Sequence, residues 1–139
     1  MAVSGPLWIT EGLKEAADAL FKDNATPEDK EIFLFSDDET ITAATVNADL
    51  TELTGSGSGK ITLTKATWDD ADGTDPVVST YNGATGVSWS ITGDLSVYGW
   101  AIRGVTSVKI YCARNWGLKT VHNEDTIVIT PFDLKWDIV

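Results

Sequence analysis

The acidic tract "WDDADGTD" at residues 68–75 holds the densest group of possible metal ligands in the chain. Ca²⁺ prefers oxygen ligands, and an EF-hand loop needs acidic residues at its first, third and fifth positions, glycine at the sixth and Glu at the twelfth. With Gly73 at the glycine position, Trp68 falls at the first position and Ser79 at the last, so two required ligands are missing. The tract is therefore not an EF-hand, and a solvated turn is the preferred interpretation. A looser Ca²⁺ site stays open as the alternative, with carboxylates from Asp69, Asp70, Asp72 and Asp75.

Cys112 and His122 are the only cysteine and the only histidine in the sequence. A zinc site of the usual kind needs more such ligands than these two residues supply. A nucleophilic Cys–His pair would also need a third member and an oxyanion hole, and no motif indicates either. The segment "NWGLKT" between them predicts a turn, and Cys112 lies among strand-forming residues, so we expect a buried structural thiol.

The sequence has no motif of a serine hydrolase, a phosphate-binding loop or a dinucleotide site. Its many carboxylates leave a glycosidase pair formally open, but no spacing singles out two of them. We therefore expect a protein that is not an enzyme, with no catalytic residue, no bound metal and no cofactor.

The six tryptophans offer another chemistry, the stacking of sugar rings on exposed aromatic faces. Trp89 alternates with serine and threonine, which is typical of a core position in a strand. Trp100 fits a core or an interface, and Trp116, directly before Gly117, is expected in a hairpin turn. Exposed aromatic residues are also enriched in protein interfaces. A carbohydrate-binding module and a protein-binding surface therefore compete for the same residues.

From residue 31 onward, apolar residues alternate with polar ones, which predicts short β-strands. The expected strands are "EIFLF" at 31–35, "GKITLTKATW" at 59–68, "GVSWSIT" at 86–92, "VYGWAIRG" at 97–104, "SVKIYCARNW" at 107–116 and "TIVITPFDLKWDIV" at 126–139. Clusters of Gly, Asn and Asp separate them, residues 69–86 are expected to form a loop, and Pro131 indicates an edge or a bulge. The pattern predicts an all-β domain over residues 31–139, an antiparallel β-sandwich or jelly roll.

Residues 34–60 connect the first two of these strands and have a mixed character. Ser and Asp in "SDDET" at 36–40 can bond their own backbone, which favours a turn. The next stretch, "AATVNADLTEL" at 43–53, predicts a short internal helix with Val46, Leu50 and Leu53 on one side. The following "TGSGSGK" at 54–60 predicts a flexible linker or a turn.

An N-terminal arm over residues 1–30 is expected to carry an amphipathic helix at "TEGLKEAADALFKDN", residues 10–24. Its apolar stripe follows the i, i+3, i+4 spacing of a helix face and consists of Leu13, Ala16, Ala17, Leu20 and Phe21. So short a helix must dock on its own domain or on a neighbouring subunit. We expect the arm to make contacts between subunits or with a partner, through Leu7, Trp8, Leu13, Leu20 and Phe21.

The chain has 10 basic and 21 acidic residues, a net charge of −11. A nucleic-acid partner needs a basic footprint, and an anionic membrane would repel this charge, so neither is expected. Neither a signal peptide nor a transmembrane run is apparent. The charge serves solubility or a partner with a basic face, and the turn at Asp37, Asp38 and Glu39 is the candidate for such a contact.

The segment "LFSDDETITAATVNADLTELTGSG" at 34–57 resembles the front half of small structural proteins of tailed bacteriophages, which carry a strand, an Asn/Asp-rich turn, a "TVLADLTEAT"-like segment and glycine. In the same order, "VSWSITGDLSVYGWAIRG" at 87–104 and "IYCARNWGLKTVHNEDTIVITPFDLKW" at 110–136 resemble their later strands. The resemblance covers about residues 31–138 and leaves out the arm. The chain departs from it at "HNED", residues 122–125, and in the tract 69–86.

The resemblance implies a non-enzymatic virion component and, within that class, a capsid decoration (cement) protein. Such a protein would bind the major capsid protein on the outside of the capsid and would be made in the host cytoplasm. The resemblance also implies a homotrimer, because decoration proteins of this sort commonly occupy threefold axes. The expected interface residues are Leu7, Trp8, Leu13, Leu20 and Phe21 of the arm, Asp37, Asp38 and Glu39 of the acidic turn, and Trp116. A tail or baseplate part and a carbohydrate-binding module remain the alternatives.

Overall fold

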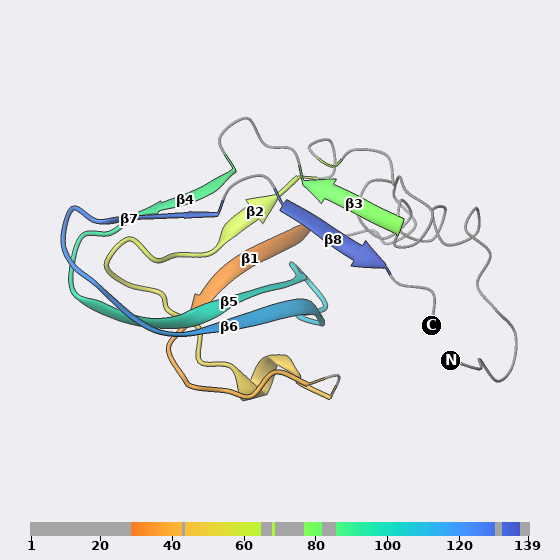
Figure 1. Cartoon of the computed structure of the whole chain (residues 1–139), viewed down its shortest axis with the longest axis horizontal. Coiled ribbons are helices and arrows are strands. Elements are labelled where there is room, and N and C mark those ends of the chain that lie inside the picture. The colour runs from red at the N-terminus through yellow and green to blue at the C-terminus, as the bar shows by residue number, and fades with distance from the viewer. Residues whose placement is uncertain are drawn as a thin grey trace, which may run out of the picture. The chain divides into compact units, whose positions relative to one another are not determined.

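The computed structural model describes residues 29–42, 44–64, 68, 77–81, 86–129 and 132–136. These residues form eight strands and one short 3-10 helix (Figure 1). The elements are β1 Lys30–Phe35, η1 Asn47–Asp49, β2 Ile61–Leu63, β3 Val77–Tyr81, β4 Val87–Ser90, β5 Leu95–Gly104, β6 Ile110–Val121, β7 Thr126–Ile129 and β8 Phe132–Trp136. The expected all-β class is therefore confirmed. The N-terminal arm and its predicted helix lie outside the described residues.

The chain divides into two compact units. The larger unit combines Glu28–Leu63 with Val87–Ile129, and the smaller unit combines Met1–Pro27, Thr64–Gly86 and Thr130–Val139. In the part of the chain that the structure describes, no helix has the length and hydropathy needed to cross a membrane.

The centre of the larger unit is a four-stranded antiparallel sheet with the strand order β2-β1-β5-β6. In its register Glu31 of β1 lies opposite Arg103 of β5, and Phe33 lies opposite Ala101. All six residues of β1 are buried, so this strand is covered on both faces. A strand buried on both sides has a continuous apolar run, which explains why "IFLF" does not alternate.

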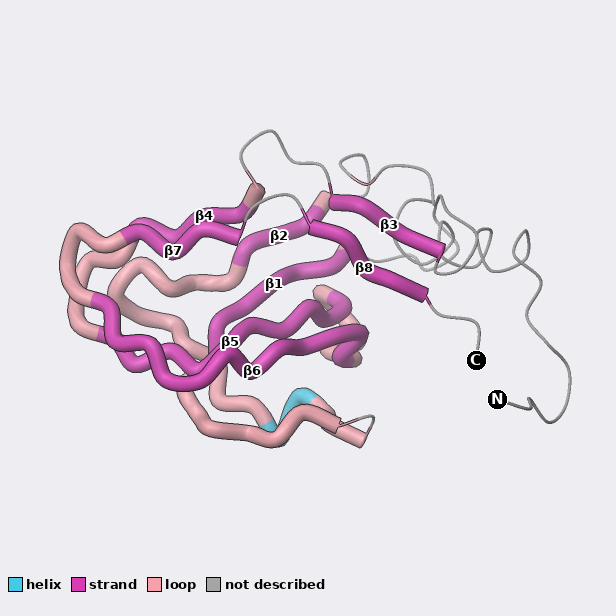
Figure 2. Tube along the Cα trace, viewed as in Figure 1, coloured by secondary structure: helices cyan, strands magenta, loops and turns pink. Residues whose placement is uncertain are grey.

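The two longest strands, β5 and β6, form a ribbon that turns a corner and continues as the pair β4–β7. The corner is closed by two backbone hydrogen bonds, from Ile91 N to Asp125 O and from Glu124 N to Ile91 O, both 2.9 Å long. Figure 2 shows both strands turning at one end of the larger unit. In β4, Val87 and Trp89 are buried whereas the serines between them are exposed, which confirms the predicted alternation.

The glycine-rich segment at 54–60 is an ordered turn rather than a linker. Ser58 is fully buried, and its backbone N–H donates to Gly55 O at 3.0 Å. Thr92 N donates to Ser56 O at 2.9 Å, so the turn lies against the corner of the ribbon. Gly57 has a φ of 81°, and a Cβ there would clash with the Ser90 carbonyl. Trp89 Nε1 completes the packing by donating to Gly59 O at 2.8 Å.

The expected turn at "NWGLKT" is wrong, because these residues lie inside β6. Gly117 has a φ of 80°, and the register shifts beside it: Val97 pairs with Lys119, whereas Gly99 pairs with Asn115. The glycine therefore serves a β-bulge, a role that sequence alone does not separate from a turn. The hairpin between β5 and β6 turns at residues 105–109 instead, where Val108 has the uncommon φ of 51°.

The predicted internal helix at 43–53 is reduced to the three-residue 3-10 helix η1. Val46, Leu50 and Leu53 do not share a side as expected, because Val46 is 54% exposed and Leu50 is buried. Such a short helix takes its stability from packing rather than from its own hydrogen bonds.

The smaller unit contains the antiparallel pair β3–β8, with Val77 opposite Trp136 and Tyr81 opposite Phe132. Trp68 forms an isolated β-bridge with Tyr81. The two aromatic rings pack edge to face, with their centroids 5.3 Å apart. The expectation that residues 69–86 are a loop is therefore wrong for β3. The acidic residues at 69–75, proposed above as a possible Ca²⁺ site, lie outside the described residues.

Candidate interaction surface

One face of the central sheet is covered by the segment that follows β1, which we call the cover segment, residues 36–42 and 44–53. It leaves the end of β1 and returns beside it, because Ser36 N donates to Thr51 O and Leu53 N donates to Leu34 O, both at 2.9 Å. Its Leu50 joins a buried apolar cluster on the sheet, with Ile41 packed against that cluster. The other buried members are Phe33, Phe35 and Ala101.

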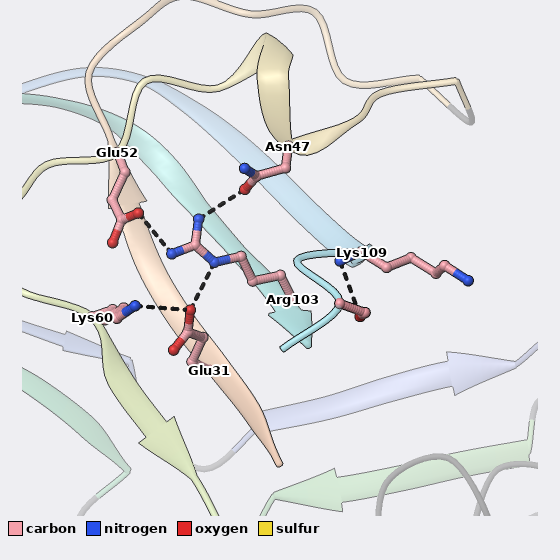
Figure 3. Close-up of polar contacts among 7 residues, drawn as sticks. Glu31, Asn47, Glu52, Lys60, Arg103 and Lys109 are labelled. Atoms are coloured by element: carbon pink, nitrogen blue, oxygen red, sulfur yellow. Dashed lines mark hydrogen bonds and ion pairs between the residues drawn. The ribbon is translucent and has the colours of Figure 1, made fainter. Parts of the chain in front are cut away.

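Arg103 of β5 holds this segment on the sheet through a polar network (Figure 3). Its guanidinium donates to Glu31 Oε1 at 2.8 Å, to Asn47 Oδ1 at 2.8 Å and to Glu52 Oε2 at 2.7 Å. The same group lies 4.3 Å from the ring centroid of Phe33. One buried cation thus connects β1, η1 and the returning end of the cover segment.

The charge of Arg103 is maintained by its partners. Burial alone would lower the pKa of Arg103, but hydrogen bonds and attraction from Glu31 and Glu52 outweigh that effect and raise it. Lys60 adds a second cation 3.4 Å from Glu31 Oε1. A buried ion network of this kind fixes geometry more than it adds stability, because desolvation offsets much of the attraction.

The acidic turn that the sequence singled out is built into this fold. Asp37 Oδ1 accepts a hydrogen bond from Thr51 N at 2.9 Å, and Asp38 Oδ1 accepts one from Asn115 Nδ2 at 2.9 Å. Asn115 Nδ2 also donates to the backbone carbonyl of Glu39 at 2.9 Å. Asp38 is exposed, and Asp37 and Glu39 are half-buried. The two aspartates therefore connect the cover segment to itself and to β6 through hydrogen bonds.

Asn115 is a residue that sequence reasoning missed. It lies on β6, and its Oδ1 accepts a hydrogen bond from Gly117 N at 2.8 Å, so it braces the bulge as well as the acidic turn. The one available signal was an asparagine two residues before a glycine, a pattern that also occurs in ordinary turns.

A groove runs between the cover segment and the first residues of β6, and we call it the β6 groove. One part has a volume of about 280 Å³ and is lined by Ile41, Thr42, Thr45, Ile110, Tyr111, Cys112 and Ala113. The adjoining part has a volume of about 370 Å³ and is lined by Thr45, Val46, Asn47, Ala48, Val108, Lys109 and Ile110. Val46 and Val108 are 54% and 44% exposed, so large apolar side chains line an open surface.

Cys112 lines the groove, but its chemistry does not favour catalysis. Burial raises the pKa of the Cys112 thiol to about 12. Such a thiol is almost entirely protonated at neutral pH and is a poor nucleophile. Among the described residues no group of three His, Cys, Asp or Glu side chains could hold a metal ion.

The remaining candidate residues from the sequence are the tryptophans and the residues of the N-terminal arm. Trp116 is half-buried within β6, and its Nε1 donates to Val97 O at 3.4 Å. Trp68 and Trp89 are buried and Trp100 is half-buried, so none of these four described tryptophans is fully exposed. The arm residues Leu7, Trp8, Leu13, Leu20 and Phe21 lie outside the described residues.

Comparison with protein-family models, with curated proteins and with solved structures gives no match.

Proposed function

We propose that this chain is a non-enzymatic structural protein of a phage virion, which binds the outer capsid surface and staples neighbouring capsid subunits. One observation carries the proposal: residues 34–57, which resemble the front half of phage structural proteins, include the whole cover segment. Arg103 and Asn115 fix that segment on the sheet, and it presents an open apolar groove. Such a surface suits a protein contact.

The stapling works by mass action. A protein that binds the assembled shell and not its free subunits stabilises the shell by an amount that grows with its concentration and affinity. We propose a homotrimer bound to the major capsid protein, because several linked contacts raise the effective affinity at each site. The architecture belonging to this proposal is a β-sandwich, in which the β4–β7 pair and the central sheet are its two layers.

The net charge favours the outer surface of the capsid. Packed DNA inside a capsid repels a chain that carries a charge of −11. A tail or baseplate position would serve the same kind of contact surface, and the two positions differ in copy number per virion. The decisive measurement is fractionation of the parent virions into heads and tails, followed by quantitative detection of this chain. We expect it in the head fraction in many copies, and its recovery with tails in few copies would refute the decoration role.

A pair of matched variants tests the surface itself. We expect Val46→Asp to weaken attachment of the purified protein to undecorated heads about tenfold or more, because a carboxylate is then buried in the apolar contact. Val128→Asp is the control, since Val128 is 53% exposed, close to the 54% of Val46, and lies on β7 away from the groove. Equal attachment of the two variants would exclude the β6 groove from the interface.

A further inference from the structure

In the part of the chain that the structure describes, β6 is an edge strand of the central sheet. There β5 is the only strand beside β6, which has 12 residues, whereas β2 at the opposite edge of the sheet has 3. Short edge strands are one of the devices by which proteins avoid unwanted pairing, and long ones are templates for it. The outer edge of β6 therefore offers backbone donors and acceptors to another chain.

The same strand is basic within an acidic protein. Lys109, just before β6, and Arg114 and Lys119 within it are exposed, and no carboxylate of the described residues lies within ion-pair distance of them. By contrast, Lys60 and Arg103 are both paired with Glu31. No acidic residue occurs between Val108 and Val121. Two such cations on β6 and a third just before it, in a chain of charge −11, mark a surface for an anionic partner.

The β6 groove lies beside the first part of this strand. Its lining includes Ile110 and Ala113, with Val46 and Val108 exposed at its border. In strand addition the main-chain hydrogen bonds provide affinity, and pockets for alternate side chains provide specificity. The edge and the groove together have both of these parts.

We propose that the outer edge of β6 binds an extended acidic segment of a partner protein by strand addition. The backbone of that segment pairs with β6, its apolar side chains enter the β6 groove, and its carboxylates lie against Arg114 and Lys119. This inference does not depend on a virion role, because it follows from the edge, the charge and the groove alone.

The charge also decides between possible occupants of the edge. Antiparallel pairing of β6 with β6 of a second copy, in the register that sets Arg114 opposite Lys119, would place like charges across the strands, which is destabilising. A nucleic acid would meet three cations but would be repelled by the rest of the acidic chain. An acidic peptide strand satisfies the backbone edge and the cations at once.

The probe is a short capped peptide with alternating Val and Thr in one half and alternating Glu and Thr in the other. We expect saturable binding by the full-length protein, with slower hydrogen exchange of the backbone amides of residues 110–121. Two further probes should bind at least tenfold more weakly: the same peptide with Lys in place of Glu, and the same peptide with N-methylated backbone amides. Absence of binding, or equal binding of the N-methylated peptide, would overturn strand addition. Tighter binding of a single-stranded oligonucleotide to the same residues would assign the edge to nucleic acid instead.

Matched variants locate the contact. Arg114→Ser/Lys119→Ser changes the net charge from −11 to −13, and Ser88→Glu/Thr126→Glu on the exposed face of β4–β7 makes the same change elsewhere. Exposed ion pairs contribute modestly, so the loss of two should weaken peptide binding about threefold to tenfold in the first variant only. Equal weakening in both variants would show a general charge effect and would refute a site on β6.

Discussion

Arg103 shows how a single residue can hold two distant parts of the chain in place. Its side chain is buried and donates to acceptors from β1, η1 and the end of the cover segment. Replacement of both ions by apolar groups is often tolerated, whereas removal of one partner leaves a buried charge uncompensated. The stability of the larger unit therefore depends on this guanidinium more than on any exposed cation.

We expect Arg103→Met to lower the free energy of unfolding by about 3–5 kcal/mol, because Glu31 then stays buried without its main partner. Urea unfolding followed by tryptophan fluorescence measures the loss. Arg114→Met is the control, since Arg114 is exposed and its removal should change stability by only about 0.5 kcal/mol or less. A loss below about 1 kcal/mol for Arg103→Met would show that the network is not needed to hold the cover segment.

His122 and Asp94 form an ion pair at the corner of the ribbon, with Nδ1 and Oδ1 2.9 Å apart. The hydrogen bond and the negative charge of Asp94 raise the pKa of His122. A raised pKa means that the pair stabilises the fold while His122 is protonated, below its ordinary pKa. The contribution is lost as the pH rises through the raised value, and it is small because both side chains are exposed.

We expect Asp94→Asn to move the pKa of His122 down toward the ordinary value of about 6.5. Because His122 is the only histidine, its ring resonances in a proton NMR titration need no assignment by mutation. Glu39→Gln removes a carboxylate that makes no contact with His122 and serves as the control. An unchanged His122 pKa in Asp94→Asn would mean that the pair does not form in solution.

Among the elements, β6 depends on the positive φ of Gly117, a backbone conformation that residues other than glycine rarely adopt. The φ of 80° lets three residues of β6 bulge opposite one of β5, and Asn115 braces the bulge. An L-residue in this conformation has its Cβ too close to the following carbonyl oxygen. Because of the bulge, Trp116 lies within β6 rather than in a hairpin turn, and its Nε1 donates to the backbone carbonyl of Val97.

We expect Gly117→Ala to lower the free energy of unfolding by about 1–2 kcal/mol through this backbone strain. Gly59→Ala is the matched control, because its φ is not positive and a Cβ there meets no atom within 4 Å. Thermal or urea unfolding of both variants gives the comparison. If Gly117→Ala were as stable as Gly59→Ala, the strand would have to accommodate the register shift in another way.

The local pattern of apolar and polar residues was sufficient to predict a strand where the side chains are buried continuously or alternately along it. It predicted β1 from "EIFLF" and the inward positions of Val87 and Trp89 in β4. It failed where distant residues decide the conformation. Asn115 and Asp38 are 77 positions apart, and Arg103 and Glu31 are 72 apart, so no local period reveals either bond. The bulge glycine was mistaken for a turn, because a positive φ serves both.

At the scale of the whole molecule, the charge distribution is uneven. The chain is acidic overall, yet the exposed cations Arg114 and Lys119 lie on one strand, while Asp37 and Asp38 are hydrogen-bonded within the fold. A test of attachment through the acidic turn must therefore separate charge from structure. Substitution of Asp37 or Asp38 would disturb both, whereas Glu39 is held by Asn115 through its backbone carbonyl, which Glu39→Gln leaves in place.

If the acidic turn faces a basic partner surface, the rate of attachment to capsids should fall as NaCl rises, because salt screens exposed charges. We expect Glu39→Gln to slow attachment at low salt by about twofold, since one surface ion pair contributes about 0.2–1 kcal/mol. The variant should also reduce the slope of the attachment rate against salt concentration. Its unfolding midpoint should stay unchanged. Glu124→Gln removes the same charge at the corner of the ribbon and should leave the slope as it is. Identical slopes for the two variants would mean that the partner approaches another face, and the basic edge of β6 would then be the surface to test next, with the opposite sign of charge on its partner.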